Sequence, residues 1–355
     1  MSPSPAAPQP SPPRRWSLVV LTLLSALSAI SGGLALVVWA SSDDFVPLEV
    51  LEPTVFETFL VPGLVLMGVV GGTSLVAAIA ELRRAAAAAE LSLLAGGTLT
   101  VWIAAEVAMM RGFHWLQGLY GVLGLAILSL AAAACLRSGR LRPRWTVLVT
   151  AGEAVGYLAP ATAGVLATRA GLTEGQQALA VVLAGPIEGL LLGLGQAFAL
   201  PLPIRRLRYA LWTALGAGVV WASVMSTMVL AGGEATPSPA VLVPLGIAVG
   251  AIGLVAIGGA QWLELRHHTA GAGRWIAWTA LAWVIALPLS FTPGPFVDET
   301  TPLAANLVLW VCGGVLMAYA MALCTWQGAR RLPAVADALR TSAPAPDPAP
   351  ASSDA

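Results

Sequence analysis

Ten long apolar stretches recur through the chain from Trp16 to Trp326, each close in length to one crossing of a lipid bilayer. A helix needs about 20 mostly apolar residues to cross about 30 Å of hydrocarbon. Hydrophobic residues make up 57% of the chain and charged residues only 10%, so little sequence remains for a soluble domain. We therefore predict ten spans: Trp16–Ala40, Phe59–Ala80, Leu91–Met110, Gly118–Leu136, Thr146–Ala167, Ala178–Leu200, Tyr209–Ala231, Ala240–Leu265, Trp275–Phe291 and Leu303–Trp326.

These spans predict an all-α fold, a polytopic transmembrane helix bundle. A basic cytoplasmic linker, 137–145, divides a four-span block, 16–136, from a six-span block, 146–326. The segments 1–15 and 332–355 are rich in Pro, Ala and Ser and hold few side chains large enough to build a core. We predict that both are disordered cytoplasmic tails.

The arginines predict the orientation of the bundle, since short basic loops stay on the cytoplasmic side. All eighteen basic residues are arginines, and sixteen of them fall in one alternating set of loops and tails. Only Arg111 and Arg169 fall in the other set. We expect a multi-pass protein of a bacterial cytoplasmic membrane, embedded in the lipid bilayer, with the N- and C-termini in the cytoplasm.

Several tryptophans lie near predicted span ends, where an amphipathic indole prefers the boundary between lipid and water. We predict that they form belts at the two membrane surfaces. The set comprises Trp16, Trp39, Trp115, Trp145, Trp275 and Trp326.

The six-span block contains an apparent internal repeat of one hairpin. Placing Gln196 on Gln261 also aligns Gly193 with Gly258, and one residue of slack brings together two copies of Trp-Thr-Ala-Leu. Each copy is a span, a basic loop and a span, so the two hairpins would be related in parallel. Chance matching in an Ala- and Leu-rich chain is the alternative.

Both blocks also carry motifs that resemble known families. The first block, with residues 61–64, 71–72, 102–103 and 115–124, resembles small four-span bacterial membrane proteins. The second block, with residues 258–266 and 278–281, is similar to a bacterial membrane family with repeated Gln-Trp hairpins. Neither family has an assigned activity, so the resemblance implies a fold and a location but no functional residue.

Glu188 is the strongest candidate for a functional residue. An ionisable group inside a span costs about 2.5–3.5 kcal/mol on insertion scales, so its presence suggests a function. Glu188 lies near the middle of its span and follows Gly185 and Pro186, and a proline removes one intrahelical hydrogen bond and can break the helix. Such a carboxyl group could bind a cation or relay a proton. The alternative is a protonated glutamate that bonds to a neighbouring helix.

Two further glutamates join the candidate coupling or solute site. Glu153 lies inside its own span, with Tyr157 one helical turn later as a candidate hydrogen-bond partner. Glu106 lies nearer the outer surface, where Arg111 or His114 could pair with it. If the three carboxyl groups share one cavity, a proton- or cation-coupled transporter becomes the best explanation.

Three glycines follow one another at four-residue spacing in the span of Glu188. Gly185, Gly189 and Gly193 place a smooth strip on one helix face, which is typical of close helix packing in membranes. We predict a packing role for them.

Enzyme signatures such as a zinc-binding His-Glu-x-x-His helix or a phosphate-binding loop do not occur in the sequence. We predict no cofactor, no metal site and no nucleic-acid partner, and an enzymatic role is not favoured. Two functions stay open: a transporter-like or permease-like protein for a small solute or ion, or a non-catalytic scaffold or regulatory subunit of a membrane complex. A cavity that reaches Glu188 would favour the first, and solid packing there the second.

Overall fold

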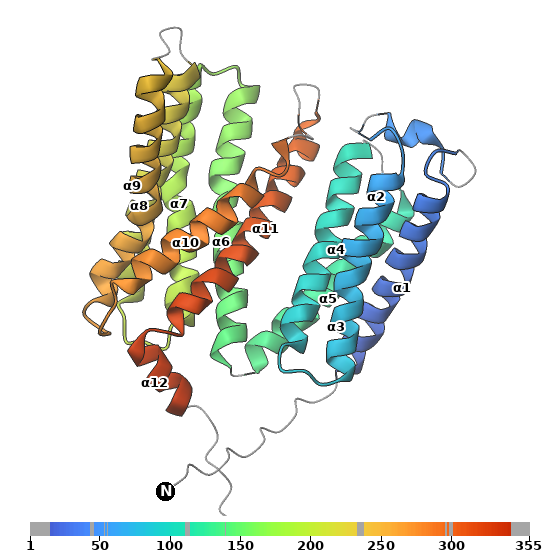
Figure 1. Ribbon diagram of the computed structural model, residues 1–355, viewed down its shortest axis with the longest axis horizontal. Coiled ribbons are helices and arrows are strands. Elements are labelled where there is room, and N and C mark those ends of the chain that lie inside the picture. The colour runs from blue at the N-terminus through green and yellow to red at the C-terminus, as the bar shows by residue number, and fades with distance from the viewer. Residues whose placement is uncertain are drawn as a thin grey trace, which may run out of the picture.

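The computed structural model describes residues 15–42, 46–52, 54, 56–110, 114–138, 140–232, 238–294, 297 and 301–341. The regular secondary structure of these residues is helical (Figure 1). The elements are α1 (Trp16–Val38), η1 (Leu48–Leu51), α2 (Leu60–Val65), η2 (Leu66–Gly71), α3 (Gly72–Leu82), α4 (Ala88–Met110), α5 (Trp115–Arg137), α6 (Leu141–Arg169), α7 (Glu174–Ala199), α8 (Arg206–Gly232), α9 (Pro239–Leu265), α10 (Arg274–Ser290), α11 (Leu303–Ala329) and α12 (Pro333–Thr341).

The chain is a multi-pass integral membrane protein. Among the described residues, eight helices are long and apolar enough to cross a membrane, counting α2, η2 and α3 as one rod from Leu60 to Leu82. Each of the ten predicted spans coincides with a helix. The two outside the eight are α10, which has 17 residues, and α6, whose apolar sequence is interrupted by Glu153 and Pro160.

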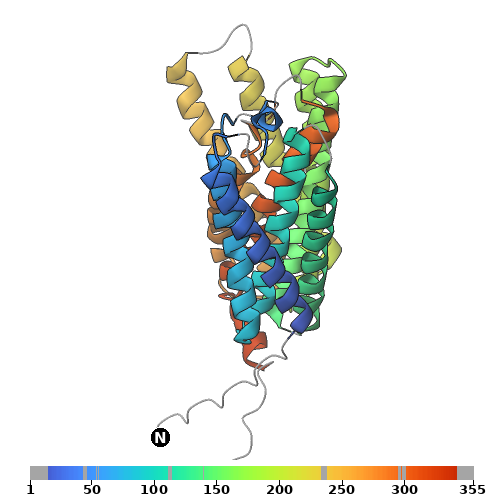
Figure 2. The ribbon, with the colours of Figure 1, turned by 90° about the vertical axis from the view of Figure 1, so that its right-hand side faces the viewer.

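The helices form two groups. In the first, α1, the rod 60–82, α4 and α5 pack together. In the second, each of α6 to α11 contacts the next helix and α11 contacts α6, so the six helices close a ring. Figure 1 shows α10 crossing this group obliquely, and α4 and α11 join the two groups. In Figure 1 and Figure 2 most helices of both groups run roughly along the vertical of the view.

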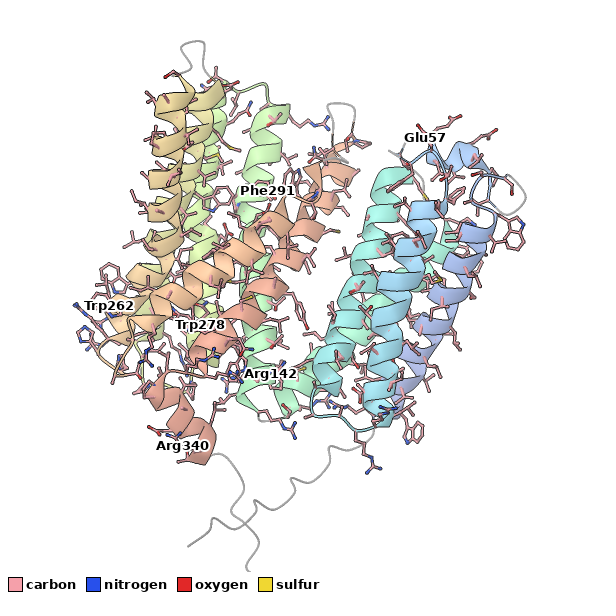
Figure 3. The ribbon with its side chains drawn as sticks, in the orientation of Figure 1. Glu57, Arg142, Trp262, Trp278, Phe291 and Arg340 are labelled. Carbon is pink, nitrogen blue, oxygen red and sulfur yellow. The ribbon has the colours of Figure 1, made fainter. Side chains whose placement is uncertain are left out.

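The two ends of the bundle carry different charged residues. Figure 3 places Arg142 and Arg340 toward the end that holds α12, and Glu57 at the opposite end. The arginines between α7 and α8 and between α9 and α10 also lie at the α12 end, since those connections follow α7 and α9 there (Figure 1). We call this the basic end.

Two segments differ from the prediction. Residues 333–341, expected in a disordered tail, form α12, because Leu332 and Val335 bury their side chains in the core of the second group. The Ala334 N–H also donates to Thr269 Oγ1 at 3.3 Å. The linker 137–145 is largely helical, since α6 begins at Leu141. The remaining tail residues, 1–14 and 342–355, lie outside the described residues.

Half of the predicted belt tryptophans belong to the core instead. Trp16, Trp39 and Trp115 are exposed on the bundle surface, as a belt residue is. Trp145, Trp275 and Trp326 are buried, and the Trp145 ring centroid lies 6.0 Å from that of Trp275 and 6.2 Å from that of Trp326. These three side chains point into the ring of helices because the ring needs large side chains to fill its centre.

Candidate functional site

Glu153 and Glu188 both lie in the interior of the ring. Glu153 of α6 is 0% exposed and Glu188 of α7 is 4% exposed. The two side chains lie close to each other, because Gly156, three residues after Glu153, packs against the Glu188 backbone and both glutamates line the same cavity. Two carboxylates close together repel each other, so the pair is stable only with a shared proton or a bound cation. The ring thus brings together two of the three glutamates that the sequence singled out.

Glycines bring α6 and α7 close enough for this arrangement. A Cβ on Gly156 of α6 would lie 2.8 Å from the Cα of Glu188, and one on Gly152 would lie 2.5 Å from the Leu191 carbonyl oxygen. Real Cβ atoms do not approach so closely, so neither position accepts a larger residue without a shift of the backbones. The pair of carboxyl groups therefore depends on glycine at the α6–α7 contact.

Trp221 of α8 fixes one of the two carboxyl groups. Its Nε1–H donates to Glu188 Oε2 at 2.6 Å. The indole fits there because Gly185 leaves room, since a Cβ on Gly185 would lie 2.6 Å from Trp221 Cγ. Gly189 and Gly193 face the same helix: added Cβ atoms would lie 2.5 Å from the Ala217 Cβ and 2.7 Å from the Ala210 Cα. The whole strip thus contacts α8, and its first glycine also shapes the site.

The sequence led us to expect a break in α7 at Pro186, but the structure shows none. The helix continues without interruption from Glu174 to Ala199. One missing N–H removes a single bond of the ladder, and the bonds of the flanking turns and the packing against α6 and α8 hold the rest. Glu188 therefore projects from an intact helix wall.

A cavity of about 820 Å³ reaches both carboxyl groups. It runs through the ring from Arg169 and Glu174, at the end opposite the basic end, to Glu153 and Glu188, and every helix of the ring contributes to its lining. Most of the lining side chains are apolar or aromatic. The lining includes Trp221, Met225, Trp283, Asn306 and Trp310.

Several buried side-chain nitrogen and oxygen atoms that line this cavity have no hydrogen-bond partner among the described residues. They include both carboxyl oxygens of Glu153, the Trp283 Nε1 and the Asn306 Oδ1. Glu153 and Trp283 are both more than nine-tenths buried. A buried polar atom without a partner costs about 1–3 kcal/mol, so these groups are suited to receive something that enters the cavity.

Tyr157 and Glu106 lie elsewhere than two possibilities raised by the sequence would place them. Tyr157 does not bond to Glu153; its hydroxyl lies beside Ser290 of α10 and its ring packs against Gly314 of α11. Glu106 does not line the cavity and lies instead beside Trp102 and Gln117 in the first helix group. Its proposed partner Arg111 lies outside the described residues. Rotation of α4 about its axis decides where Glu106 points, and the sequence does not fix that rotation.

A polar network that we did not predict lies in the ring about two turns of α7 from Glu188, toward the basic end. The Gln261 Nε2 donates to Gln196 Oε1 at 2.7 Å and to Thr213 Oγ1 at 3.1 Å. The Tyr209 hydroxyl donates to Gln196 Oε1 at 3.0 Å, and the Trp275 Nε1 donates to Gln261 Oε1 at 2.6 Å. All five side chains are buried, so the network closes the ring below the cavity.

Residues at equivalent positions in the two hairpins of the predicted repeat make similar contacts. Each glutamine accepts from an aromatic side chain near the start of the following helix, Tyr209 in one hairpin and Trp275 in the other. Gly193 faces Ala210 and Thr213, and Gly258 faces Ile276 and Thr279. The pairing of Gln196 with Gln261 was visible in the sequence, but the direct bond between them was not.

Glu264 is fully buried at the basic end. It accepts from the Arg205 backbone N–H at 3.1 Å, from Arg208 Nε and from His268, whose Nε2 lies at 3.2 Å. This carboxylate joins the α7–α8 connection to α9, and it is separate from the cavity. Its role is to hold the two hairpins together.

No family model, curated protein or solved structure matches the chain. The resemblance of the two blocks to bacterial membrane families therefore stays a prediction.

Proposed function

We propose that this chain is a permease-like protein of a bacterial cytoplasmic membrane, which moves a small solute or ion and uses Glu188 and Glu153 as its coupling site. The observation that carries the proposal is the cavity of about 820 Å³ that ends at the two carboxyl groups. A carboxyl pair that alternates between a proton and a cationic solute links the movement of one to the movement of the other.

The orientation follows from the arginines. Sixteen of the eighteen arginines fall on one side of the predicted spans, so the basic end and both termini face the cytoplasm in this proposal. The cavity then opens outward at Arg169 and Glu174, and the network around Gln196 and Gln261 closes it on the cytoplasmic side. A cysteine introduced between Arg205 and Arg208 should react with an impermeant maleimide only after the cells are opened.

A scaffold or regulatory subunit would be expected to pack solidly around Glu188. The cavity at that position favours transport over the scaffold.

The test is a flux assay in proteoliposomes that contain the pH-sensitive dye pyranine. Sodium, potassium, methylammonium, amphipathic organic cations, amino acids and sugars are added one class at a time, and the internal pH is recorded. We expect at least one class to drive proton movement above that of protein-free liposomes, and Glu188→Gln and Glu153→Gln to abolish it. Glu106→Gln, a matched change outside the cavity, should behave as the unmodified protein. Flux that survives Glu188→Gln unchanged, or no flux with any class, would reject the proposal.

A further inference from the structure

The cavity also indicates what kind of molecule it takes, and this step rests on the solute pathway proposed above. We infer that the solute is an amphipathic organic cation, with an apolar body and one positive charge, and that it enters from the lipid between α7 and α8.

The size and chemistry of the cavity suit such a molecule. Its volume of about 820 Å³ falls within the range of about 300–1,000 Å³ for small-molecule sites, and a bare metal ion would leave most of it empty. Aromatic and apolar side chains line it, Trp221, Trp283 and Trp310 among them. Indole faces attract cations as well as apolar groups. A sugar or an amino acid would need many more polar partners than this lining offers.

The charges within the cavity select for a cation. Glu153 and Glu188 lie together at its inner end, and the unpartnered Asn306 Oδ1 adds another acceptor. The described charged side chains in the lining, besides these two, are Arg169 and Glu174 near the mouth. Arg169 is sixteen residues from Glu153 along α6, or about 24 Å at 1.5 Å per residue, too far to neutralise the pair.

The route through lipid follows from a second groove, of about 520 Å³, between α7 and α8. Three residues line both the groove and the cavity: Ala178 of α7 and Met225 and Val229 of α8. The groove also contacts Leu179 and Leu230, whose side chains are exposed on the outer face of the bundle. Small and flexible side chains thus separate the cavity from the bilayer, so a solute with an apolar body can pass between α7 and α8.

The test of the solute class uses two probes of nearly the same shape and opposite charge. Binding of tetraphenylphosphonium and of tetraphenylborate to the purified full-length protein in detergent is measured by equilibrium dialysis. We expect saturable binding of the cation and none of the anion. Glu188→Gln and Glu153→Gln should each weaken cation binding about tenfold or more, and Glu106→Gln should leave it unchanged. Equal binding of both probes, or of neither, overturns the inference without any variant having to fold.

The test of the route compares two variants on α7. In lipid nanodiscs, Ala178→Phe should slow the association of tetraphenylphosphonium, because the larger ring fills the passage. Leu183→Phe, at a side chain that is 68% exposed, is the control. Association as fast in Ala178→Phe as in the control overturns the lateral route. Cation binding without any flux would support the inferred ligand class and reject the transport proposal. Flux of other solutes without cation binding would support transport and overturn the inferred ligand class.

Discussion

Gly185→Ala tests how α7 and α8 hold the carboxyl group of Glu188. A Cβ at this position would lie 2.6 Å from the Cγ and 2.9 Å from the Cβ of Trp221. These atoms are close to the α8 backbone, so the indole cannot simply swing away at its tip. Either α8 moves outward or Trp221 changes rotamer, and both break its 2.6 Å hydrogen bond to Glu188.

The expected cost follows from three terms. Overpacking costs about 1–3 kcal/mol. The lost hydrogen bond adds about 0.6–2 kcal/mol in a membrane setting, and the better helix propensity of alanine returns about 1 kcal/mol. The free energy of unfolding should therefore fall by about 0.6–4 kcal/mol. Gly175→Ala is the matched control on the same helix, because an added Cβ there meets nothing within 4 Å.

Unfolding in mixed micelles with increasing SDS, followed by far-ultraviolet circular dichroism, measures both variants. A double-mutant cycle with Trp221→Ala isolates the steric part, and we expect a coupling of about 0.5–3 kcal/mol between the two positions. If Gly185→Ala proves as stable as Gly175→Ala, the close contact between Gly185 and Trp221 is not a feature of the folded protein.

Three further changes test other contacts. Gln261→Leu should lower the free energy of unfolding by about 2–4 kcal/mol, measured in the same SDS titration, because three hydrogen bonds disappear and buried partners lose theirs. Val335→Asp should release α12, seen as faster hydrogen exchange of residues 333–341 while the other helices keep their protection. Arg15→Gln should cost about 1–3 kcal/mol of unfolding free energy in SDS, because buried Glu81 then keeps only its bond from Ser92.

Each of these changes has a control at a more exposed position. Half-buried Gln327 lies outside the glutamine network, so Gln327→Leu should change stability by less than about 0.5 kcal/mol. Thr341→Asp, at the exposed end of α12, should leave exchange of that helix unaltered. Arg83→Gln replaces an exposed arginine and should be neutral in the SDS titration. A control that loses as much as its partner would contradict the contact under test.

The spans could be predicted because a bilayer imposes a length and an apolarity on every helix that crosses it. The cost of an ionisable group in lipid likewise singled out Glu153 and Glu188. Their proximity could not be predicted, since it depends on the rotation of α6 and α7 about their axes. Gly152 and Gly156 set that rotation, and glycines are too common in this chain for those two to stand out.

Position along a helix was a poor guide to burial. Trp115 and Trp275 both lie near the start of a predicted span, yet Trp115 is exposed and Trp275 is buried in the ring. A tryptophan near the end of a span can lie on the lipid-facing surface or fill the end of the helix ring. Its position in the sequence does not distinguish the two. Segment 333–341 was misjudged for a related reason, because one valine and one leucine suffice to dock α12 when the bundle already offers a surface for them.

The closed ring limits how this architecture can change by duplication. Trp145, near the start of α6, donates from Nε1 to the Ala322 carbonyl oxygen of α11 at 3.1 Å, and Tyr157 of α6 packs on Gly314 of the same helix. A third copy of the hairpin inserted after α10 would come between α10 and α11, and the ring would have to widen to include it. The packing around the acidic pair would then be lost, so we expect a longer relative of this chain to add its helices outside the six.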